Sequence, residues 1–259
     1  MDHHLTTDVM GFVSYDRGFK SGVYNLLSYA AAPVSPEILD AYQAGAKAEI
    51  ADHRVRLNAT AFYYRYKDVQ VEQIAAGVVT ALNAAAAEMK GLDIDAEYVP
   101  IESLTLRAGI ETLNGHYTNF HDAPFNNRAI DEAGRAIGGD VTSSGDATGF
   151  DTVRSPKFSA NVSAAYRTPV AIGKLDLSVT YYYNDGFAWD PDNRLRQGRY
   201  NLLSMSAGWS SPTEAFGVRL WGKNLTGAQT CAFAEAISLG DICSPNAPRT
   251  YGVTLTARL

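Results

Sequence analysis

Apolar and polar residues alternate along most of this chain with a period of two. Between Arg54 and Tyr63 the odd positions from Val55 onward are apolar, and the even positions up to Thr60 are polar. Successive side chains of a β-strand point to opposite faces of a sheet, so the pattern predicts a strand with one apolar and one wet face. In a helix the same residues would be scattered around the circumference.

The alternation recurs from one end of the chain to the other and predicts about ten strands. The segments are residues 9–20, 40–51, 54–63, 92–98, 103–111, 157–167, 174–183, 203–209, 216–220 and 251–259. Most are longer than the roughly 5–6 residues usual in globular sheets, and several suit the roughly 9–11 residues of a tilted membrane strand. The lengths therefore favour strands that cross a bilayer.

Long and short connections follow one another between these segments. We expect about 19, 5, 35, 10 and 23 residues on one side and about 2, 3, 5 and 3 on the other. Outer-membrane barrels have short periplasmic turns and longer extracellular loops, so the segregation predicts a transmembrane β-barrel. A soluble β-sandwich that binds a ligand is the weaker alternative, because a sandwich has no reason to separate its connections in this way.

The composition agrees with strands that face lipid. Only 19% of the residues are charged, below the roughly 25% of soluble domains, and the chain has 15 Tyr. The net charge of −6 and the scattered Lys and Arg residues give no basis for binding nucleic acid. Since no stretch approaches about 18 consecutive apolar residues, a bilayer crossing would have to use strands. Met1–Leu5 has no signal-peptide character, so either a signal was lost or the chain is a piece of a longer protein.

Seven motifs, in order, resemble the barrel of TonB-dependent outer-membrane receptors. They are Tyr15–Gly22, Pro36–Glu37 with Tyr42–Lys47, Phe62–Val71, Met89–Asp93, Pro156–Phe158, Trp221–Thr226 and Pro248–Gly252. The resemblance implies an all-β fold, an antiparallel up-and-down meander that forms the C-terminal strands of the family's 22-stranded barrel. Residues 1–259 would then be one partial barrel domain in the outer membrane of a Gram-negative bacterium.

The resemblance also implies the partners. In the family an N-terminal plug carries the TonB box, and neither is found here, so we expect TonB to act only through a plug outside this chain. The last strand resembles the signal read by the barrel-assembly machinery, with Leu259 where an aromatic residue is usual. The parent receptor is expected to import a scarce small molecule, such as a ferric siderophore, cobalamin or a glycan.

Residues for ligand contact are expected in the long connections. The segment Asn119–Arg154 is rich in Asn, Asp, Gly and Ser, and long loops of this kind are binding elements or disordered. Aromatic and Arg side chains contribute most contact energy per residue. The candidates are Tyr24, Phe120, Phe125, Arg128 and Trp189.

Cys231 and Cys243 are the only cysteines and lie in the last long connection. A zinc site would need further ligands nearby, and the sequence has none there. We expect a disulfide, which would stabilise the loop by about 3 kcal/mol on the chain-entropy model in an oxidising compartment. Two free thiols are the alternative.

No pattern indicates an enzyme, a metal site or a cofactor. The phosphate-loop, dinucleotide-binding, serine-hydrolase and zinc-protease motifs are missing from the sequence. Asp93, Asp95 and Glu97 alternate with apolar residues, so we interpret them as a hydrated lumen face. A small standalone barrel that acts as an enzyme or adhesin is the alternative function, and its enzymatic form would need His53, His116 or His121 beside a Ser or Asp partner near one rim.

A ten-stranded open sheet would be unstable in a membrane. Each edge has roughly ten unpaired backbone groups, and each group costs at least about 2 kcal/mol in hydrocarbon. The sum exceeds the roughly 5–15 kcal/mol that stabilises a typical domain. The strands must therefore close into a smaller barrel, pair with another chain, or fail to fold alone.

Overall fold

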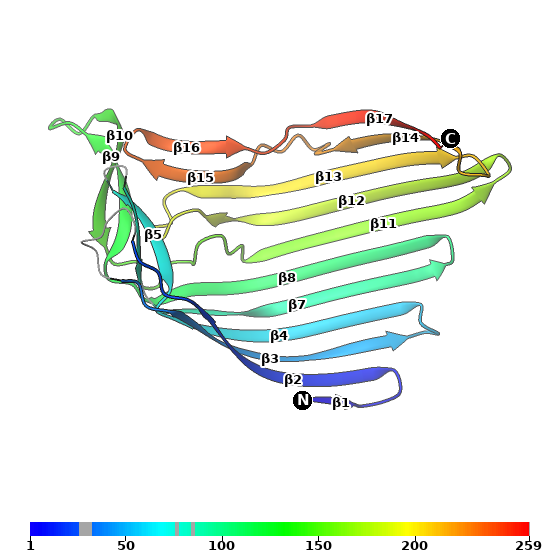
Figure 1. The fold of residues 1–259 in the computed structure, drawn as a ribbon, viewed down its shortest axis with the longest axis horizontal. Coiled ribbons are helices and arrows are strands. Elements are labelled where there is room, and N and C mark those ends of the chain that lie inside the picture. The colour runs from blue at the N-terminus through cyan, green and yellow to red at the C-terminus, as the bar shows by residue number, and fades with distance from the viewer. Residues whose placement is uncertain (26–32, 76–77, 84–85, 259) are drawn as a thin grey trace.

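The computed structural model describes residues 1–25, 33–75, 78–83 and 86–258, and all of its regular structure there is β. Eleven strands form one antiparallel sheet in the order β1-β2-β3-β4-β7-β8-β11-β12-β13-β14-β17 (Figure 1). Their bounds are β1 Asp2–His4, β2 Val9–Lys20, β3 Glu37–Ile50, β4 Val55–Lys67, β7 Ala86–Ile101, β8 Leu104–Asn119, β11 Phe158–Val170, β12 Gly173–Ala188, β13 Arg196–Ser210, β14 Phe216–Lys223 and β17 Thr250–Ala257. Within these described ranges no helix is long and apolar enough to cross a membrane.

The meander confirms the ten strands predicted from alternation. Every long strand of the sheet coincides with one predicted segment, and the three-residue β1 is the only addition. Most strands extend beyond the alternating core, to 16 residues in β7, β8 and β12. The pairing is continuous, for example from Lys174 opposite Ser210 to Ala188 opposite Arg196. Each hairpin is specified locally, which explains the next-neighbour order.

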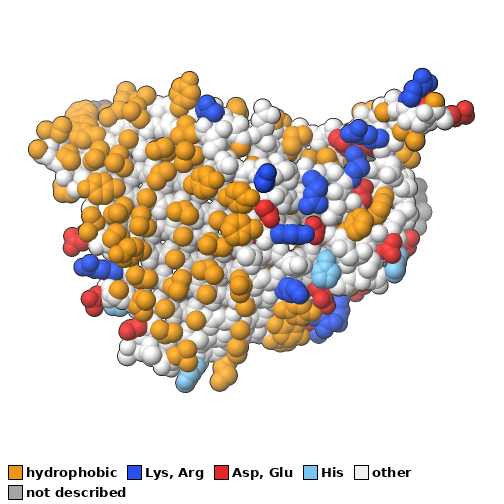
Figure 2. Space-filling model, turned by 180° about the vertical axis from the view of Figure 1, so that it is seen from behind, with side chains coloured by type: hydrophobic (Ala, Val, Ile, Leu, Met, Phe, Trp, Pro, Cys, Tyr) orange, Lys and Arg blue, Asp and Glu red, His pale blue; other side chains and the backbone are white. Residues whose placement is uncertain are grey.

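The two faces of the sheet differ in chemistry. One row across seven strands is apolar and comprises Ala48, Leu57, Ala96, Ala108, Val162, Tyr181 and Leu203. The next row, displaced by one residue, is polar and comprises Glu49, Arg56, Glu97, Arg107, Ser163, Thr180 and Ser204. Figure 2 shows apolar side chains spread over the strand half of one face, with charged side chains toward the loop end. A one-residue slip would exchange the faces, so their contrast specifies the register.

The polar face contains short ion pairs. Arg56 lies 3.1 Å from Glu49, and Arg107 lies 2.6 Å from Glu97. Glu97 thus has an Arg partner on the next strand, in agreement with its interpretation as part of a hydrated face. No group of three or more His, Cys, Asp or Glu residues is placed to hold a metal ion in the described part of the chain.

The long connections are more ordered than the sequence predicts. They contain three hairpins, formed by β5 Gln70–Ala75 with β6 Val78–Asn83, β9 Ala123–Ile130 with β10 Ala136–Gly145, and β15 Cys231–Ile237 with β16 Gly240–Pro245. The expected connection of about 5 residues after β4 was wrong, because residues 68–85 lie between β4 and β7 and include β5 and β6. Short apolar stretches such as Val78–Leu82 were not predicted to be strands, because the sequence alone indicated no neighbouring strand for them to pair with.

The buried hydrophobic cluster lies where the loop ends of β7 and β8 meet the long connection that follows β8. It consists of Ala87, Tyr117, Phe120, Ala123 and Ala147, and Tyr117 and Phe120 are each only 2% exposed. Their rings meet edge to face, with centroids 5.1 Å apart. Because the sheet presents its apolar residues outward, this cluster is the main dry contact between strands and loops.

The sheet is open in the described part of the chain. β1 and β17 occupy opposite edges and do not pair with each other there. Of the three outcomes expected for an open sheet, closure of these strands on themselves is therefore not the arrangement found. Leu259, the residue expected in the aromatic position of the assembly signal, lies outside the described residues.

Candidate functional site

Three loop segments meet at the end of the sheet opposite the short turns. We call them together the apex: hairpin β9–β10, residues 189–195 between β12 and β13, and hairpin β15–β16. Figure 1 shows both hairpins at this end, and β10 contacts both β15 and β16. Segments more than 40 residues apart in sequence are therefore neighbours here, as the Arg194–Asp241 hydrogen bond shows with a separation of 47.

Arg194 joins the three segments of the apex. Its Nη1 and Nη2 donate to Asp241 of β16 at 3.0 and 2.7 Å, and Nη2 lies 3.4 Å from Asp140 of β10. Fork-shaped pairing of this kind is both strong and directional. Arg194 holds the pKa of Asp241 below its ordinary value, whereas burial raises the pKa of Asp140, which has the longer contact. The Arg194 guanidinium thus takes the place of water as the hydrogen-bond donor to two carboxylates from different hairpins.

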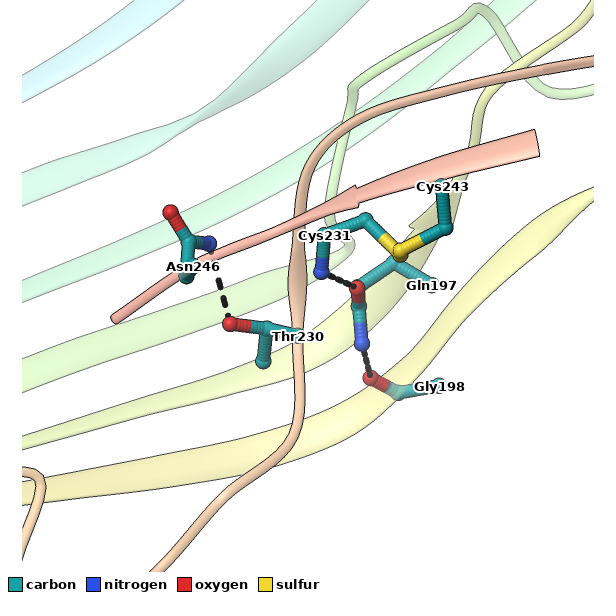
Figure 3. The surroundings of a disulfide bond; sticks show 6 residues. All are labelled: Gln197, Gly198, Thr230, Cys231, Cys243 and Asn246. Atoms are coloured by element: carbon teal, nitrogen blue, oxygen red, sulfur yellow. Dashed lines mark hydrogen bonds between the residues drawn. A yellow bond between two sulfur atoms is a disulfide. The ribbon is translucent and has the colours of Figure 1, made fainter. Parts of the chain in front are cut away.

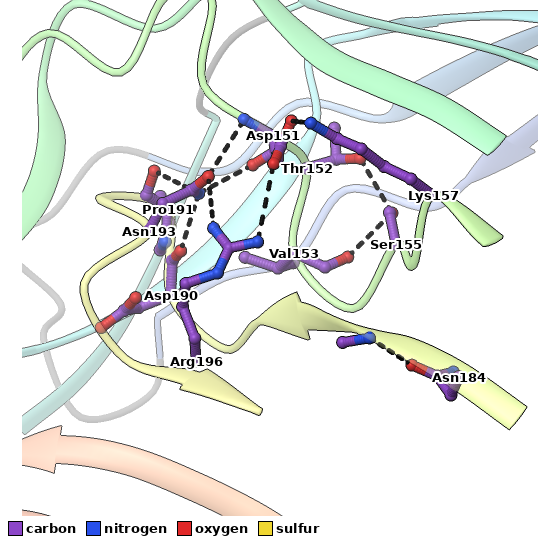
Figure 4. Close-up of polar contacts among 11 residues, drawn as sticks. Asp151, Thr152, Val153, Ser155, Lys157, Asn184, Asp190, Pro191, Asn193 and Arg196 are labelled. Atoms are coloured by element: carbon purple, nitrogen blue, oxygen red, sulfur yellow. Dashed lines mark hydrogen bonds and ion pairs between the residues drawn. The ribbon is translucent and has the colours of Figure 1, made fainter. Parts of the chain in front are cut away.

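A second set of contacts fixes residues 189–195 to the strand ends (Figure 4). Asn193 adopts a left-handed backbone with φ 57°, which Asn tolerates better than most residues. Its Nδ2 donates to the Asp151 carbonyl at 2.9 Å, and its Oδ1 accepts from the Asp151 amide at 3.1 Å. The Asp151 carboxylate also lies 3.1 Å from Lys157 Nζ and 3.7 Å from Arg196. The Asn193 side chain and the backbone and carboxylate of Asp151 together attach residues 189–195 to the starts of β11 and β13.

A disulfide closes the third segment (Figure 3). Cys231 and Cys243 are joined, with their Cα atoms 5.6 Å apart. The Cys231 amide donates to Gln197 Oε1 of β13 at 3.0 Å, and Asn246 Nδ2 donates to Thr230 Oγ1 at 3.0 Å. Hairpin β15–β16 is thus closed at its base and attached to the main sheet.

A pocket of about 120 Å³ lies between these segments. Trp189 and Phe233 line it, with ring centroids 6.4 Å apart, and Phe187 packs edge to face on Trp189 at 4.9 Å. The Arg154 guanidinium lies over the Trp189 ring at 5.1 Å, within the range of a cation–π interaction. Asp190 also lines the pocket, and burial together with the neighbouring Asp192 carboxylate raises its pKa to about 7.

The structure distributes the five expected contact residues over different surroundings. Trp189 lines the pocket, and Arg128 is exposed on β9. Phe125 packs against the buried cluster with its ring 5.9 Å from Phe150, and Phe120 is inside that cluster without free surface. Tyr24 is 78% exposed, and its neighbour Asn25 bonds Ala81 of β6, so it lies beside hairpin β5–β6 and away from the pocket residues.

Sequence reasoning missed Arg154, Asp190, Arg194 and Asp241. The run Trp189-Asp190-Pro191-Asp192-Asn193-Arg194 was the available signal, because an aromatic residue followed by turn-forming and charged residues is typical of a structured loop. Asp241 had no local signal, since its role depends on a residue 47 positions away.

The histidines do not assemble into a site with enclosing walls. His121 Nδ1 lies 3.1 Å from Asp146, but the side chains are 70% and 55% exposed. His53 lies 3.4 Å from Glu49 at a short turn.

Comparison with known proteins identifies the same architecture. The model of the family described as TonB dependent receptor-like, beta-barrel, matches residues 2–225. The pesticin receptors of Yersinia enterocolitica and Yersinia pestis are each 25% identical to the chain over 254 residues, which cover 96% of this chain and 34% of each receptor. The chain thus spans about a third of the length of the curated relatives it matches.

Solved structures share the fold at lower identity. The ferric yersiniabactin uptake receptor FyuA from Yersinia pestis superimposes with a TM-score of 0.79 at 23% identity, over 97% of this chain and 35% of that chain. The siderophore receptor PiuA from Acinetobacter baumannii gives a TM-score of 0.70 at 16% identity, over 98% of this chain and 34% of that chain. The fold of this chain thus recurs over about a third of the length of longer proteins of distant sequence.

Proposed function

This chain belongs to the TonB-dependent receptor family, in its β-barrel domain, and we propose from that premise that it forms the C-terminal strands and ligand-capturing loops of an outer-membrane siderophore receptor. The open edges then pair with the remaining strands of the barrel, which removes the cost of unpaired backbone groups in hydrocarbon. Residues 1–259 make one partial barrel domain, in the outer membrane of a Gram-negative bacterium.

The observation that carries the proposal is the preorganised apex. A disulfide, a three-segment ion pair and the Asn193–Asp151 contacts hold an aromatic pocket at the loop end of the sheet. The Arg154 guanidinium lies over its Trp189 wall and forms no ion pair within the described part of the chain. Rigid aromatic and Arg side chains bind a ligand with little loss of conformational entropy. Ferric chelates of siderophores are flat or compact and carry carboxylate or phenolate oxygens, which such a surface can contact. Trp189 is the central contact residue in this proposal, and Arg128 and Tyr24 are outlying ones.

The other partners follow from the family. The outward apolar rows contact outer-membrane lipid, the last strand is recognised by the barrel-assembly machinery, and TonB acts through the plug domain that receptors of this family carry. We propose no enzymatic activity, because the His121–Asp146 pair is open to water.

The test uses Trp189 as a reporter. The chain has three Trp residues, so a Trp209→Phe, Trp221→Phe double variant retains only the one in the pocket. The variant is expressed behind a signal peptide together with the strands that complete the barrel, because the open sheet alone is not expected to be stable in a membrane. It is recovered from outer membranes, with boiled and unboiled samples compared on a gel to verify assembly. The probes are ferric yersiniabactin, which FyuA takes up, and ferric preacinetobactin, the ligand of the structurally similar receptor BauA from Acinetobacter baumannii. Saturable quenching by one of them is expected.

Matched variants separate the pocket from the remainder of the apex. Arg154→Gln should weaken binding about fivefold, since a cation–π contact from an exposed guanidinium contributes up to about 1 kcal/mol. Arg135→Gln, at the exposed end of hairpin β9–β10, should leave binding unchanged. Assembled protein that shows no quenching with either chelate, or equal effects of both substitutions, would contradict the proposal.

A further inference from the structure

A trough of about 510 Å³ crosses the outward apolar face of the sheet from β11 to β17. Two neighbouring outward rows border it. One row comprises Ala164, Val179, Met205, Gly222 and Tyr251, and the other comprises Tyr166, Leu177, Ala207 and Leu220. Between the two rows lie Ser178, Ser206 and Trp221, whose side chains point to the opposite face. The floor of the trough is therefore backbone.

Small residues keep the trough open. Ala164 and Ala207 present only a methyl group to it, and Gly222 has no side chain. Leu225 lies over Gly222, because a Cβ atom at position 222 would be only 2.7 Å from Leu225 Cδ2. Leu225 thus borders the trough beside β14 on the loop side of the sheet.

The floor of the trough offers no free polar group to an occupant. The hydroxyl groups of Ser178 and Ser206 are hydrogen-bonded to each other at 2.9 Å, and Trp221 Nε1 donates to Thr254 Oγ1 at 3.2 Å. No charged side chain of the described chain lines the trough. An occupant must therefore be apolar.

The trough lies at the depth of the hydrocarbon in a membrane-spanning barrel. On β13 it is lined by Met205 and Ala207, with Trp209 on the short-turn side of them. On β12 the next outward residue on the loop side is Tyr181. Because aromatic girdles mark the two interfaces of a transmembrane barrel, the residues between them face lipid chains.

The dimensions of the trough suit one hydrocarbon chain. It spans five strands that are about 4.8 Å apart, so its length is about 19 Å. With a volume of about 510 Å³, this length leaves a cross-section of about 27 Å², or roughly 5 Å in each direction. Carbon atoms in contact are about 3.5–4.0 Å apart, so one chain fills this width. An α-helix is about 10–12 Å across, and proteins span a bilayer only as helices or closed barrels, so a protein segment does not fit.

We propose that this trough is a binding site for one acyl chain of a membrane lipid, held at a fixed place on the outward face. Barrel strands are tilted by about 35–45°, so a chain that runs across them is also inclined to the membrane normal and can enter from a leaflet. The inference rests on the outer-membrane barrel of the proposed function. It is independent of the ligand at the apex.

The experiment uses this chain expressed behind a signal peptide together with the strands that complete the barrel, extracted from outer membranes in a mild detergent. Native mass spectrometry counts the lipids that each barrel retains. The parent barrel should retain one lipid, and an Ala164→Leu, Ala207→Leu variant, whose added side chains fill the trough, should retain it at least tenfold less often. Ala96→Leu, Ala108→Leu is the matched control, because it makes the same change on the outward face of β7 and β8, and should retain lipid like the parent.

A second readout locates the acyl chain. A Trp189→Phe, Trp209→Phe variant retains only Trp221, which lines the trough. Phosphatidylcholine vesicles with brominated acyl chains are the probe, because bromine quenches indole fluorescence at close range. Quenching of Trp221 should be at least threefold greater with the open trough than after Ala164→Leu and Ala207→Leu are added.

Several results would overturn the inference. Equal lipid retention by the parent and the trough-filled barrel is one, and an equal loss in the control is another. Quenching of Trp221 that filling leaves unchanged is a third. A dimer that only the parent forms would assign the trough to a second copy of the chain. An assembled barrel that binds a ferric chelate and retains no lipid overturns this inference alone, whereas a barrel without the boiling-dependent gel shift contradicts the proposed function and the lipid site with it.

Discussion

Removal of the Cys231–Cys243 disulfide should release hairpin β15–β16 while the main sheet stays intact. The cysteines are 12 positions apart. For a loop of that size the chain-entropy relation predicts about 3 kcal/mol of stabilisation, equivalent to about a 150-fold change in the ratio of open to closed hairpin. The effect should be local, because β15 and β16 pair only with each other and not with the eleven-stranded sheet.

The remaining contacts of the hairpin set a limit on the effect. The Arg194–Asp241 pair and the bond from the Cys231 amide to Gln197 still attach the hairpin when the disulfide is gone. Opening must break both, and it leaves Arg194 with Asp140 alone. The pocket then loses its Phe233 wall, so binding at the apex should weaken together with hairpin stability.

The assay is native-state hydrogen exchange on the assembled Cys231→Ser, Cys243→Ser variant. Amides of β15 and β16 should exchange about 150-fold faster than in the parent chain, and those of β12 and β13 should be unchanged. The parent chain treated with a reductant is the matched control and should behave like the variant. An acceleration below about threefold in the hairpin, or an equal acceleration in β12 and β13, would refute the reasoning that the disulfide is a local clamp.

Three other substitutions or conditions test separate features. Arg194→Met removes the cation between Asp140 and Asp241 and should destabilise the folded apex by about 3 kcal/mol. The loss is measured as faster cleavage of the apex by a protease, and Arg194→Lys should recover part of the resistance. Unchanged cleavage would contradict the bridging role. Asp52→Gly should raise the temperature at which the gel shift occurs on heating. Asp52 has φ 54°, and glycine adopts this conformation without the roughly 1 kcal/mol penalty of an L-residue. A lower transition temperature would contradict this prediction. Asp190 has a raised pKa in the folded chain, so the folded apex binds this proton more tightly than the unfolded chain does. Its contribution should therefore be greatest below about pH 4 and should be lost as the pH rises to about 7, and hydrogen exchange of residues 189–195 that slows over this range would contradict the assignment.

At the loop end of the sheet, some predictions from the sequence identified a residue that matters but assigned it a role that differs from the one in the structure. Phe120 was correctly placed in the long connection, yet its ring packs with Tyr117 under the hairpin and not at the surface. A large aromatic residue in a long loop can serve either to bind or to bury, and the sequence pattern around it is the same in both cases. The choice depends on Ala123 and Ala147 meeting the ring from other positions of the loop.

The sequence by itself determined the long strands of the main sheet, their faces and their order, but not the three loop hairpins. Alternation is a property of neighbouring residues, and an up-and-down meander pairs each strand with the next, so local patterns such as Val55–Tyr63 and short turns such as residues 51–54 carry all the necessary information. The tertiary structure alone decided which loops meet. Arg194 contacts Asp140 and Asp241 across separations of 54 and 47 residues, and Asp190 is buried in a pocket that both hairpins β9–β10 and β15–β16 line. Contacts between such distant segments leave no periodic trace in the chain, because they depend on the summed geometry of every strand between them.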